Sequence, residues 1–338
     1  MFKQTAGATA ISLGAISLFW FGGWSRSTES SPAPVGSPVG VPSGPAKVPS
    51  KPPRGTSSGT LVEPGSDVNP IGFFVNYGFP GPIHDLERHK EFVSVYDRRT
   101  RNPYYVVEHL TPDSLQKGPT NGDRKNSYFR EDESVPRIFR GLLKDFFRSG
   151  YDRGHQAPAA DAKFSQDAMN ETFLLTNMSP QVGEGFNRDY WASFEYFCRT
   201  LTKQYRSVRV VTGPLYLPKR DPVDGKFRVS YEVIGNPPNV AVPTHFFKLV
   251  VAEKAFSRSY DSDDVAVAAF VLPNEKIPNE IPLTSFMVPV EALERSSGLE
   301  LLDKVPEERK KNLCREVRCE IIVRDFKDKV KALPAPRK

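Results

Sequence analysis

Short runs rich in β-branched and aromatic residues recur along the chain, each bounded by proline, glycine, asparagine or aspartate. This punctuation is typical of β-strands. The turn signals at residues 97–102 favour a hairpin between the first two runs. The pattern predicts strands at residues 91–97, 103–110, 207–213, 228–235, 246–253 and 265–273.

Three other stretches place apolar residues at the spacing of one helix face. They are residues 135–147, 187–205 and 289–296, and the last opens on a proline in its first turn. The predicted strands outnumber the helices and are mostly antiparallel. The pattern therefore predicts an α+β fold with a central, mostly antiparallel sheet flanked by helices.

The N-terminal part has a different pattern. Residues 5–24 carry no charge and lie between Lys3 and Arg26, a length that suits a membrane span. Trp20 and Trp24 stand where interfacial anchors stand. A secretory signal is the competing interpretation, but no clear small-residue cleavage site follows the run. An uncleaved anchor, or a mitochondrial signal followed by an anchor, is favoured.

Proline, serine and glycine dominate the chain after the uncharged run. Such a segment buries too little apolar surface to offset the entropy of ordering it. We therefore expect a targeting and membrane-anchor segment at 1–26, a disordered tether at 27–66, a catalytic domain at 67–328 and a basic tail at 329–338.

Charge and cysteine content narrow the function classes. The 338 residues carry a formal net charge of +6, which favours a polyanionic partner, although a merely basic soluble protein explains it equally well. Three cysteines exclude a disulfide framework and a four-thiolate zinc site. Cys198 lies in an apolar helical pattern and is predicted to be a core residue. Cys314 and Cys319 either pair in an oxidising compartment or remain free thiols.

The residues with the clearest chemistry lie between positions 151 and 195. Asp152–His155 reads Asp-Arg-Gly-His, and Asn187 and Glu195 follow. Hydrolysis of a phosphodiester needs a base for water and positive charge for the phosphate. Histidine is a base near neutral pH, and arginine matches phosphate geometry. Mg²⁺ takes oxygen ligands and needs only one or two from the protein.

Helical spacing places Asn187 on the face that also carries Trp191 and Cys198, which turns towards the protein body. A polar side chain there needs a partner, and a metal ion is one candidate. The alternative is that Asn187 only caps its helix. Glu195 is two turns further on and leans back towards the helix start, where it would hold a water of the ion's hydration shell.

These residues resemble the signature of the DNA/RNA non-specific endonuclease family, especially its endonuclease G group and the fungal mitochondrial nucleases within it. The resemblance extends from about Gly72 to the C-terminus. Further matching blocks occur in the same order, namely GFPGPIHDL at 78–86, DRKNSYFREDE at 123–133, TGPLYLP at 212–218 and VAVPTHFFK at 240–248.

The resemblance implies a ββα-metal (His-Me finger) nuclease fold, with two strands and a helix around one Mg²⁺ or Mn²⁺ ion. It implies His155 as the general base, Asn187 as the sole direct protein ligand of the ion, and Glu195 as a residue that acts through water. The ion would stabilise the leaving group. The expected reaction is metal-dependent hydrolysis of DNA and RNA to 5′-phosphate products.

The resemblance also implies roles for charged neighbours of the motif. Arg153 would position substrate, and Asp152 and Arg188 are assigned to substrate binding with it. Arg124 matches an upstream arginine that stabilises charge at the scissile phosphate, with Arg130 as a possible substitute. Members of this kind form homodimers, reside in mitochondria at the inner membrane or in the intermembrane space, relocate to the nucleus and degrade DNA in cell death.

Two other function classes compete with a nuclease. A non-catalytic nucleic-acid-binding protein tethered to a membrane would fit the charge, but would not need a complete set of base, metal ligand and arginine. Other hydrolases lack their motifs here, since we find no His-Glu-x-x-His, no Gly-x-Ser-x-Gly and no phosphate loop. Asn177 is predicted to fix a turn and Trp191 to be a core residue. The remaining histidines are predicted to be structural, with His245 bordering a cleft: His84, His89, His109 and His245.

Overall fold

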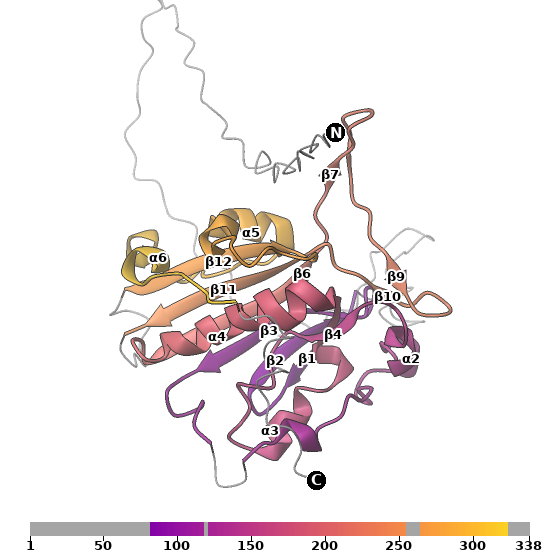
Figure 1. Cartoon of the computed structure of the whole chain (residues 1–338), viewed down its shortest axis with the longest axis horizontal. Helices are drawn as coiled ribbons and strands as arrows, with labels where there is room; N and C mark the ends of the chain where they lie inside the picture. The colour runs from indigo at the N-terminus through magenta and orange to yellow at the C-terminus, as the bar shows by residue number, and fades with distance from the viewer. Residues whose placement is uncertain (1–81, 118–120, 255–263, 324–338) are drawn as a thin grey trace, which may run out of the picture. The chain divides into compact units, whose positions relative to one another are not determined.

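An eight-stranded sheet is the centre of the computed structural model, which describes residues 82–117, 121–254 and 264–323 (Figure 1). The strand order is β1-β2-β3-β6-β11-β12-β13, and β14 pairs with β12 in the only parallel pairing of this sheet. The predicted α+β fold with a mostly antiparallel sheet is thus confirmed. The strands are β1 His84–Arg88, β2 Phe92–Asp97, β3 Asn102–Leu110, β6 Ser207–Leu215, β11 His245–Glu253, β12 Val265–Pro273, β13 Met287–Val288 and β14 Lys310–Asn312.

Most predicted strands are present. β2 and β3 form the expected hairpin, in which Asp97 pairs with Asn102. β6, β11 and β12 match the predicted runs at 207–213, 246–253 and 265–273. They lie side by side in the middle of the sheet, where both faces are covered and continuous apolar runs are favoured.

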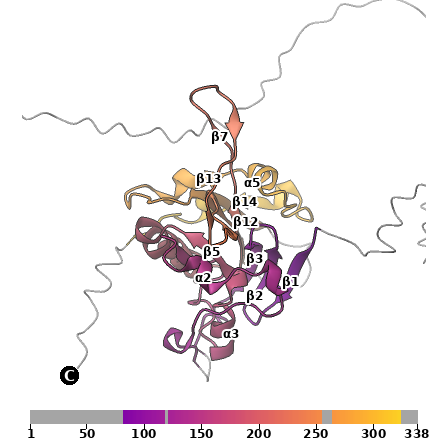
Figure 2. The same ribbon diagram turned by 90° about the vertical axis from the view of Figure 1, so that its right-hand side faces the viewer.

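The predicted strand at 228–235 is wrong. Only its ends are extended, as parts of the two-residue strands β8 Phe227–Arg228 and β9 Val233–Ile234. β6 and β11 pair directly with each other, so the chain between them finds no free sheet edge. It forms instead an arm on which β7 Lys219–Arg220 pairs with β8, and this arm projects from the body (Figure 2).

The predicted helix at 135–147 is also wrong. Its two helical pieces are short, η3 Arg137–Phe139 and α2 Leu143–Phe146, and the residues between them are extended. The Tyr96 hydroxyl donates to the Phe139 carbonyl and accepts from the Gly141 backbone N–H. These hydrogen bonds to Tyr96 of β2 take up backbone N–H and carbonyl groups that would bond to each other within a continuous helix. Ile138, expected on the buried face, is 75% exposed.

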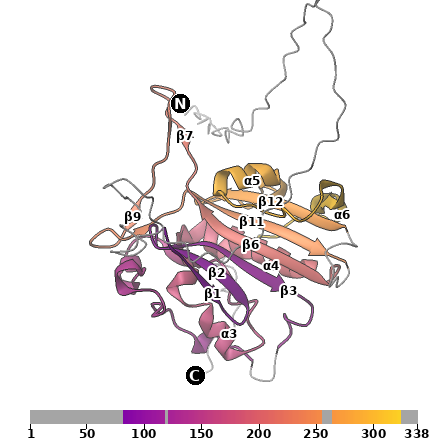
Figure 3. The same ribbon diagram turned by 180° about the vertical axis from the view of Figure 1, so that it is seen from behind.

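Two helices cover opposite faces of the sheet (Figure 3). The predicted helix at 187–205 is present as the helical stretch η5 Gly183–Trp191 followed by α4 Ala192–Leu201. Its apolar side packs on one face in a cluster that includes Trp191, Phe246 and Val250. The predicted helix at 289–296 is α5 Val290–Ser297, which places Leu293 in the cluster on the other face.

The remaining elements are short and connect the sheet to its helices. A two-stranded unit of β4 Asp152–His155 and β5 Met178–Gln181 carries the Asp-Arg-Gly-His motif. The others are β10 Val240–Ala241, η2 Arg124–Asn126, α3 Gln166–Glu171, η4 Leu175–Asn177, η6 Leu283–Phe286, η7 Glu307–Arg309 and α6 Leu313–Glu316.

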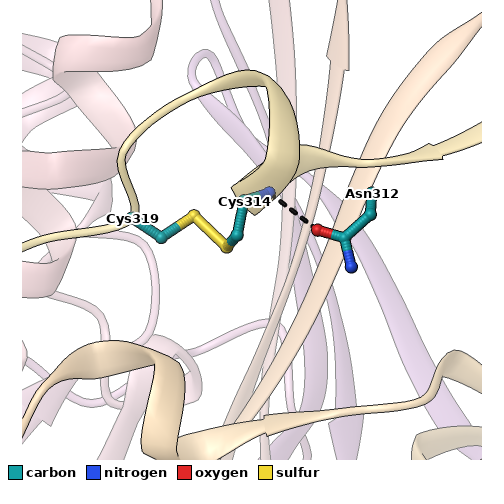
Figure 4. The surroundings of a disulfide bond; sticks show 3 residues. All are labelled: Asn312, Cys314 and Cys319. Atoms are coloured by element: carbon teal, nitrogen blue, oxygen red, sulfur yellow. Dashed lines mark hydrogen bonds between the residues drawn. A yellow bond between two sulfur atoms is a disulfide. The ribbon is translucent and has the colours of Figure 1, made fainter.

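The structure resolves the open question on two cysteines. Cys314 and Cys319 form a disulfide that closes the turn around α6, and the Asn312 side chain accepts a hydrogen bond from the Cys314 backbone N–H at 2.9 Å (Figure 4). Cys198 is a buried free thiol in the core, as predicted.

The predicted anchor at 1–26, the tether at 27–66 and the tail at 329–338 lie outside the described residues. Within the described part of the chain, none of the helices has the length and apolar character of a membrane span.

Candidate active site

The Asp-Arg-Gly-His motif forms the first strand of a two-stranded unit that leads into a helix. β4 pairs antiparallel with β5, so that Asp152 lies opposite Gln181 and His155 opposite Met178. The chain then enters η5 and α4, and residues of β4 contact residues at the start of η5. Two strands and a helix therefore bring Asp152, His155 and Asn187 into one unit.

Glycine is required inside the motif by close packing. A Cβ atom at Gly154 would lie 2.0 Å from Oε1 of Gln181, a fully buried side chain. Real Cβ contacts do not come this close, so a side chain at 154 would displace the Gln181 side chain or one of the two strands. Gly154 thereby leaves room for Gln181 between the strands beside His155.

The His155 imidazole is enclosed by two aromatic rings. Its side chain is 7% exposed, and its ring centroid lies 4.8 Å from Phe173 and 5.7 Å from Phe129. Burial, and then the positive charge of Arg124, lower the pKa of His155 to about 3. The imidazole is therefore neutral across physiological pH. Its Nε2 has no hydrogen-bond partner among the described residues, so it is free to exchange a proton.

The same two rings hold arginines. The Arg153 guanidinium lies 4.2 Å from the Phe129 ring centroid, and that of Arg124 lies 5.4 Å from the Phe173 ring centroid. Both distances are within the range of cation–π attraction. Backbone bonds between Arg130 and residues 173 and 175 join the segments that carry the rings. The positive charge of Arg124 acts on the pKa of His155, and the choice between Arg124 and Arg130 at the scissile phosphate stays a prediction.

Asp152 connects β4 to the start of the helix. Its carboxylate accepts from Asn187 Nδ2 at 2.9 Å and from the Arg188 guanidinium at 2.7 Å and 2.5 Å. Burial opposes ionisation of Asp152, but the hydrogen bonds from Arg188 and Asn187 outweigh it and lower its pKa. The predicted roles of Asp152 and Arg188 in substrate binding stay predictions, since the contacts described for them are with residues of the protein itself.

Asn187 lies in the first helical turn after the kink at Glu184 and Gly185. Its backbone N–H donates to the Val182 carbonyl across that kink, and among the described residues no hydrogen bond shows its side chain capping the helix. Its amide nitrogen is bound to Asp152, so its carbonyl oxygen is the end turned away from that carboxylate. Gly185, at φ 81°, produces the bend that precedes it.

The donor set fits a hard cation that keeps most of its water. An amide oxygen is a suitable ligand for Mg²⁺ or Mn²⁺. Among residues 82–117, 121–254 and 264–323 no three histidine, cysteine, aspartate or glutamate side chains are grouped to hold a metal ion. A site built on these residues would therefore rely on Asn187 and on ordered water.

Glu195 lies on α4 beyond Asn187. Burial raises its pKa to about 7, while the positive charges of Lys248 and Arg199 act in the opposite direction. Arg199, one turn further along, donates to Asp161 at 2.8 Å. Asp161 belongs to the loop that follows His155, so this ion pair joins the helix to the strand that carries the histidine.

Comparison with known proteins identifies the family of this chain. The profile of the family described as DNA/RNA non-specific endonuclease matches residues 72–308. The chain belongs to this family. It is therefore a nuclease, which hydrolyses phosphodiester bonds of nucleic acids, and the predicted family and enzyme class are confirmed.

Named relatives of this nuclease agree. It is 67% identical over 279 residues to the mitochondrial nuclease of Saccharomyces cerevisiae, covering 80% of this chain and 84% of that protein. It is 43% identical over 228 residues to the mitochondrial endonuclease G of Homo sapiens, covering 68% of this chain and 72% of that protein. A crystal structure of the EndoG/EndoGI complex matches with a TM-score of 0.63 and 43% identity, covering 74% of this chain and 100% of that one. These relatives confirm the predicted ββα-metal fold and mitochondrial localisation.

Other predictions about single residues of the nuclease can be checked in the structure. The fully buried Asn177 exchanges hydrogen bonds with the backbone of Ala157 and so fixes the turn after β4, as predicted. Trp191 is fully buried, also as predicted. The other four histidines have structural partners: His84 stacks on Tyr104, His89 contacts Ser94, His109 contacts Ser207 and His245 contacts Thr244.

The sequence analysis missed the side chains that surround the nuclease motif. Phe129 and Phe173 lie within segments that the family resemblance already covered, but apolar character alone suggested core positions. Lys248 was missed as well, although a lysine within the strand sequence FFKLVVAE was the signal available. Gln181 was recognised only as part of the motif's surroundings.

Proposed function

We propose that this nuclease is a metal-dependent, sugar-non-specific endonuclease that cuts DNA and RNA to 5′-phosphate products, with His155 as general base. The observation that carries the proposal is the neutral, enclosed imidazole with its unpartnered Nε2 beside Arg124 and Arg153. An unpartnered buried nitrogen costs about 1–3 kcal/mol, which a water or substrate atom would recover.

In the proposed reaction, Nε2 of His155 accepts a proton from water as the water oxygen forms a bond to phosphorus. The bond from phosphorus to the 3′ oxygen breaks and this oxygen takes up a proton from a second water, which leaves a 3′ hydroxyl and a 5′ phosphate. Arg124 and Arg153 offset the charge of the phosphate, and that anion would raise the lowered pKa of His155 towards a useful value.

The carbonyl oxygen of Asn187 would hold a Mg²⁺ or Mn²⁺ ion, with Glu195 holding a water of its hydration shell. When bound, the ion supplies positive charge at the leaving oxygen. Asp152 fixes the Asn187 amide so that its oxygen is presented outwards. Glu195, with a pKa of about 7, becomes a better acceptor as the pH rises through neutrality.

The test compares His155→Ala with wild type on plasmid DNA and on single-stranded RNA, with Mg²⁺ or with EDTA. We expect wild type to cut both only with Mg²⁺, and the variant to cut neither while binding DNA in fluorescence anisotropy. His109→Ala is the matched control, because the hydrogen bond described for the His109 side chain is with Ser207 on β6, and the variant should retain activity. Full activity in His155→Ala would overturn the assignment. Asn187→Ala should lose activity together with metal dependence.

The arm between β6 and β11 supports a second part of the proposal, a homodimer. Its apolar side chains are exposed at Val223, Phe227, Val229, Tyr231 and Val233, by 44% to 93%. A surface of this kind suits contact with a second copy. Light scattering should give a dimer for wild type and a monomer for Val229→Asp/Tyr231→Asp, and an unchanged mass would contradict this.

The uncharged run at residues 5–24 supports membrane attachment at the inner membrane, with the nuclease facing the intermembrane space. We expect the full chain to resist carbonate extraction from mitochondria. The proposed link to DNA degradation in cell death requires relocation to the nucleus. Imaging of the tagged full chain after a death stimulus tests this, and retention in mitochondria would count against it.

A further inference from the structure

A charged side chain interrupts an apolar row beneath the candidate catalytic helix. Side chains alternate between the two faces of a strand. On β11, Phe246, Lys248 and Val250 face η5 and α4, and all three are at most 1% exposed. Burial of an ammonium group is costly unless its surroundings compensate. The position of Lys248 therefore needs an explanation beyond packing.

The Lys248 ammonium joins the sheet to the helix. Its Nζ donates to Oγ1 of Thr212 on the neighbouring strand β6 at 2.7 Å. It also lies 4.8 Å from the centroid of the Trp191 ring. A cation over the face of an indole is attracted by the ring, and the attraction is strongest where water is excluded. Trp191 is fully buried, so this contact is shielded from solvent.

Carboxyl groups from several elements surround this cation. Lys248 interacts electrostatically with Glu91, with Glu108 of β3 and with Glu195 of α4, and in each case its positive charge opposes the effect of burial. Asp161 lies in the same group and is paired with Arg199. Lys248 thus contributes one of the positive charges that allow acidic groups to lie between the sheet and α4.

The position of Asn187 depends on how firmly its helix is held against the sheet. It lies four residues before Trp191, or about 6 Å along the helix axis. The turn between them follows non-helical residues at Glu184 and Gly185, so regular helix bonding does not extend past it. Asp152 holds the Asn187 side chain from β4. On the side of the sheet the helix is held by buried aromatic side chains, among which Trp191 is the one in contact with a charged group of β11.

We propose that Lys248 is a positioning residue for metal binding: its ammonium fixes Trp191 against the sheet, and the helical turn from Trp191 to Asn187 thereby presents the Asn187 amide oxygen. The inference rests on the proposed role of Asn187. Lys248 itself does not contact substrate or metal.

The test uses Lys248→Met in the full chain, because methionine retains much of the length and loses the charge. The chain has three tryptophans, so Trp20→Phe/Trp24→Phe leaves Trp191 as the single tryptophan, which is excited selectively at wavelengths where tyrosine does not absorb. In this background we expect Lys248→Met to change the Trp191 emission spectrum. Calorimetric titration with Mn²⁺ alone should show affinity weakened by roughly 10-fold or more, as for other residues that orient metal ligands.

Val250→Ala is the matched control, because Val250 is buried in the same row and carries no charge. It should lower the melting temperature without changing Mn²⁺ affinity. Thr212→Val, which removes only the hydrogen-bond acceptor, should weaken Mn²⁺ binding less than Lys248→Met and serves if the methionine variant does not fold. Unchanged Mn²⁺ affinity in the folded Lys248 or Thr212 variant would overturn the proposal, as would an equal loss in Val250→Ala.

Asn187→Ala separates failure of this inference from failure of the proposed function. If Asn187→Ala abolishes Mn²⁺ binding while Lys248→Met does not affect it, only the positioning role is wrong. If Asn187→Ala binds Mn²⁺ as wild type does, the proposed metal ligand is wrong, and the positioning role falls with it.

Discussion

Replacing Gly154 by alanine tests how closely the two motif strands must pack. The added Cβ would lie 2.0 Å from Oε1, 2.2 Å from Cδ and 2.5 Å from Cγ of Gln181. Contacts below 3.0 Å essentially do not occur, so the strands or the glutamine must separate by about 1 Å. Gln181 is fully buried, so its side chain cannot move aside without displacing its neighbours or leaving the packed interior. Overpacking of this kind costs about 1–3 kcal/mol.

The displacement falls next to His155. Misplacement of a catalytic group by about 1 Å lowers a rate by roughly 100-fold. We therefore expect Gly154→Ala to lose about that factor in kcat on plasmid DNA with saturating Mg²⁺, and to melt at a lower temperature. Gly141→Ala is the matched control, because the added Cβ would lie 3.5 Å from Cγ2 of Val240, which is an ordinary van der Waals distance.

A double variant identifies the cause of the loss. Gln181→Ala removes the three atoms that lie nearest to the new methyl group, so Gly154→Ala/Gln181→Ala should recover activity relative to Gly154→Ala. The reasoning is refuted if Gly154→Ala keeps wild-type kcat and melting temperature. It is also refuted if the double variant is no better than the product of the two single losses.

Three further predictions follow from the charges and covalent bonds of the structure. Arg124→Gln removes a positive charge that lowers the pKa of His155, so the acid limb of the kcat/KM profile should move to higher pH; an unmoved limb would show that Arg124 is distant from the imidazole. Folding lowers the pKa of His155 to about 3 and that of His245 to about 4, from the ordinary value of 6.5. The folded state therefore favours the neutral form of both imidazoles. The stability that they contribute is present above pH 6.5 and is lost as the pH falls towards these values, by up to about 1.4 kcal/mol per pH unit for each group. Denaturant titrations at pH 7 and pH 5 check this, and equal stability at the two values would contradict it. Replacing Cys314 and Cys319 by serine opens a short loop and should cost about 2 kcal/mol of unfolding free energy, with little effect on kcat; a loss of activity at unchanged stability would argue against a purely structural disulfide.

Regular elements with strong local patterns were predictable. β2, β3, β6, β11 and β12 were identified because continuous apolar runs between turn residues have few other stable forms. The helix around Asn187 was identified from the helical spacing of its apolar residues, and the last non-helical residue before it is Gly185. The kink at Glu184 and Gly185 is decided by contacts that a 3.6-residue period does not describe.

The two wrong elements failed because of distant partners. The helical spacing of residues 135–147 is real, but the Tyr96 hydroxyl captures the backbone of Phe139 and Gly141. The run at 228–235 alternates as a strand should, yet β6 and β11 leave no edge for it to join. In the first case local propensity gave way to hydrogen bonds from Tyr96, and in the second to the hydrogen-bonded pairing of β6 with β11. Both sets of bonds join residues that are far apart in the sequence.

The sequence by itself determined the chemistry of this nuclease. The residue types, order and spacing of Asp152–His155, Asn187 and Glu195 were sufficient to indicate a phosphodiester-cleaving family. Only the tertiary structure decided the protonation, the neighbouring charges and the burial of the side chains in this region. The neutrality of His155, the placement of Arg124 and the burial of Lys248 under Trp191 arise from neighbours that are distant in sequence. Charge and proton affinity depend on the local dielectric and on nearby charges, which exist only once the sheet and helix have packed.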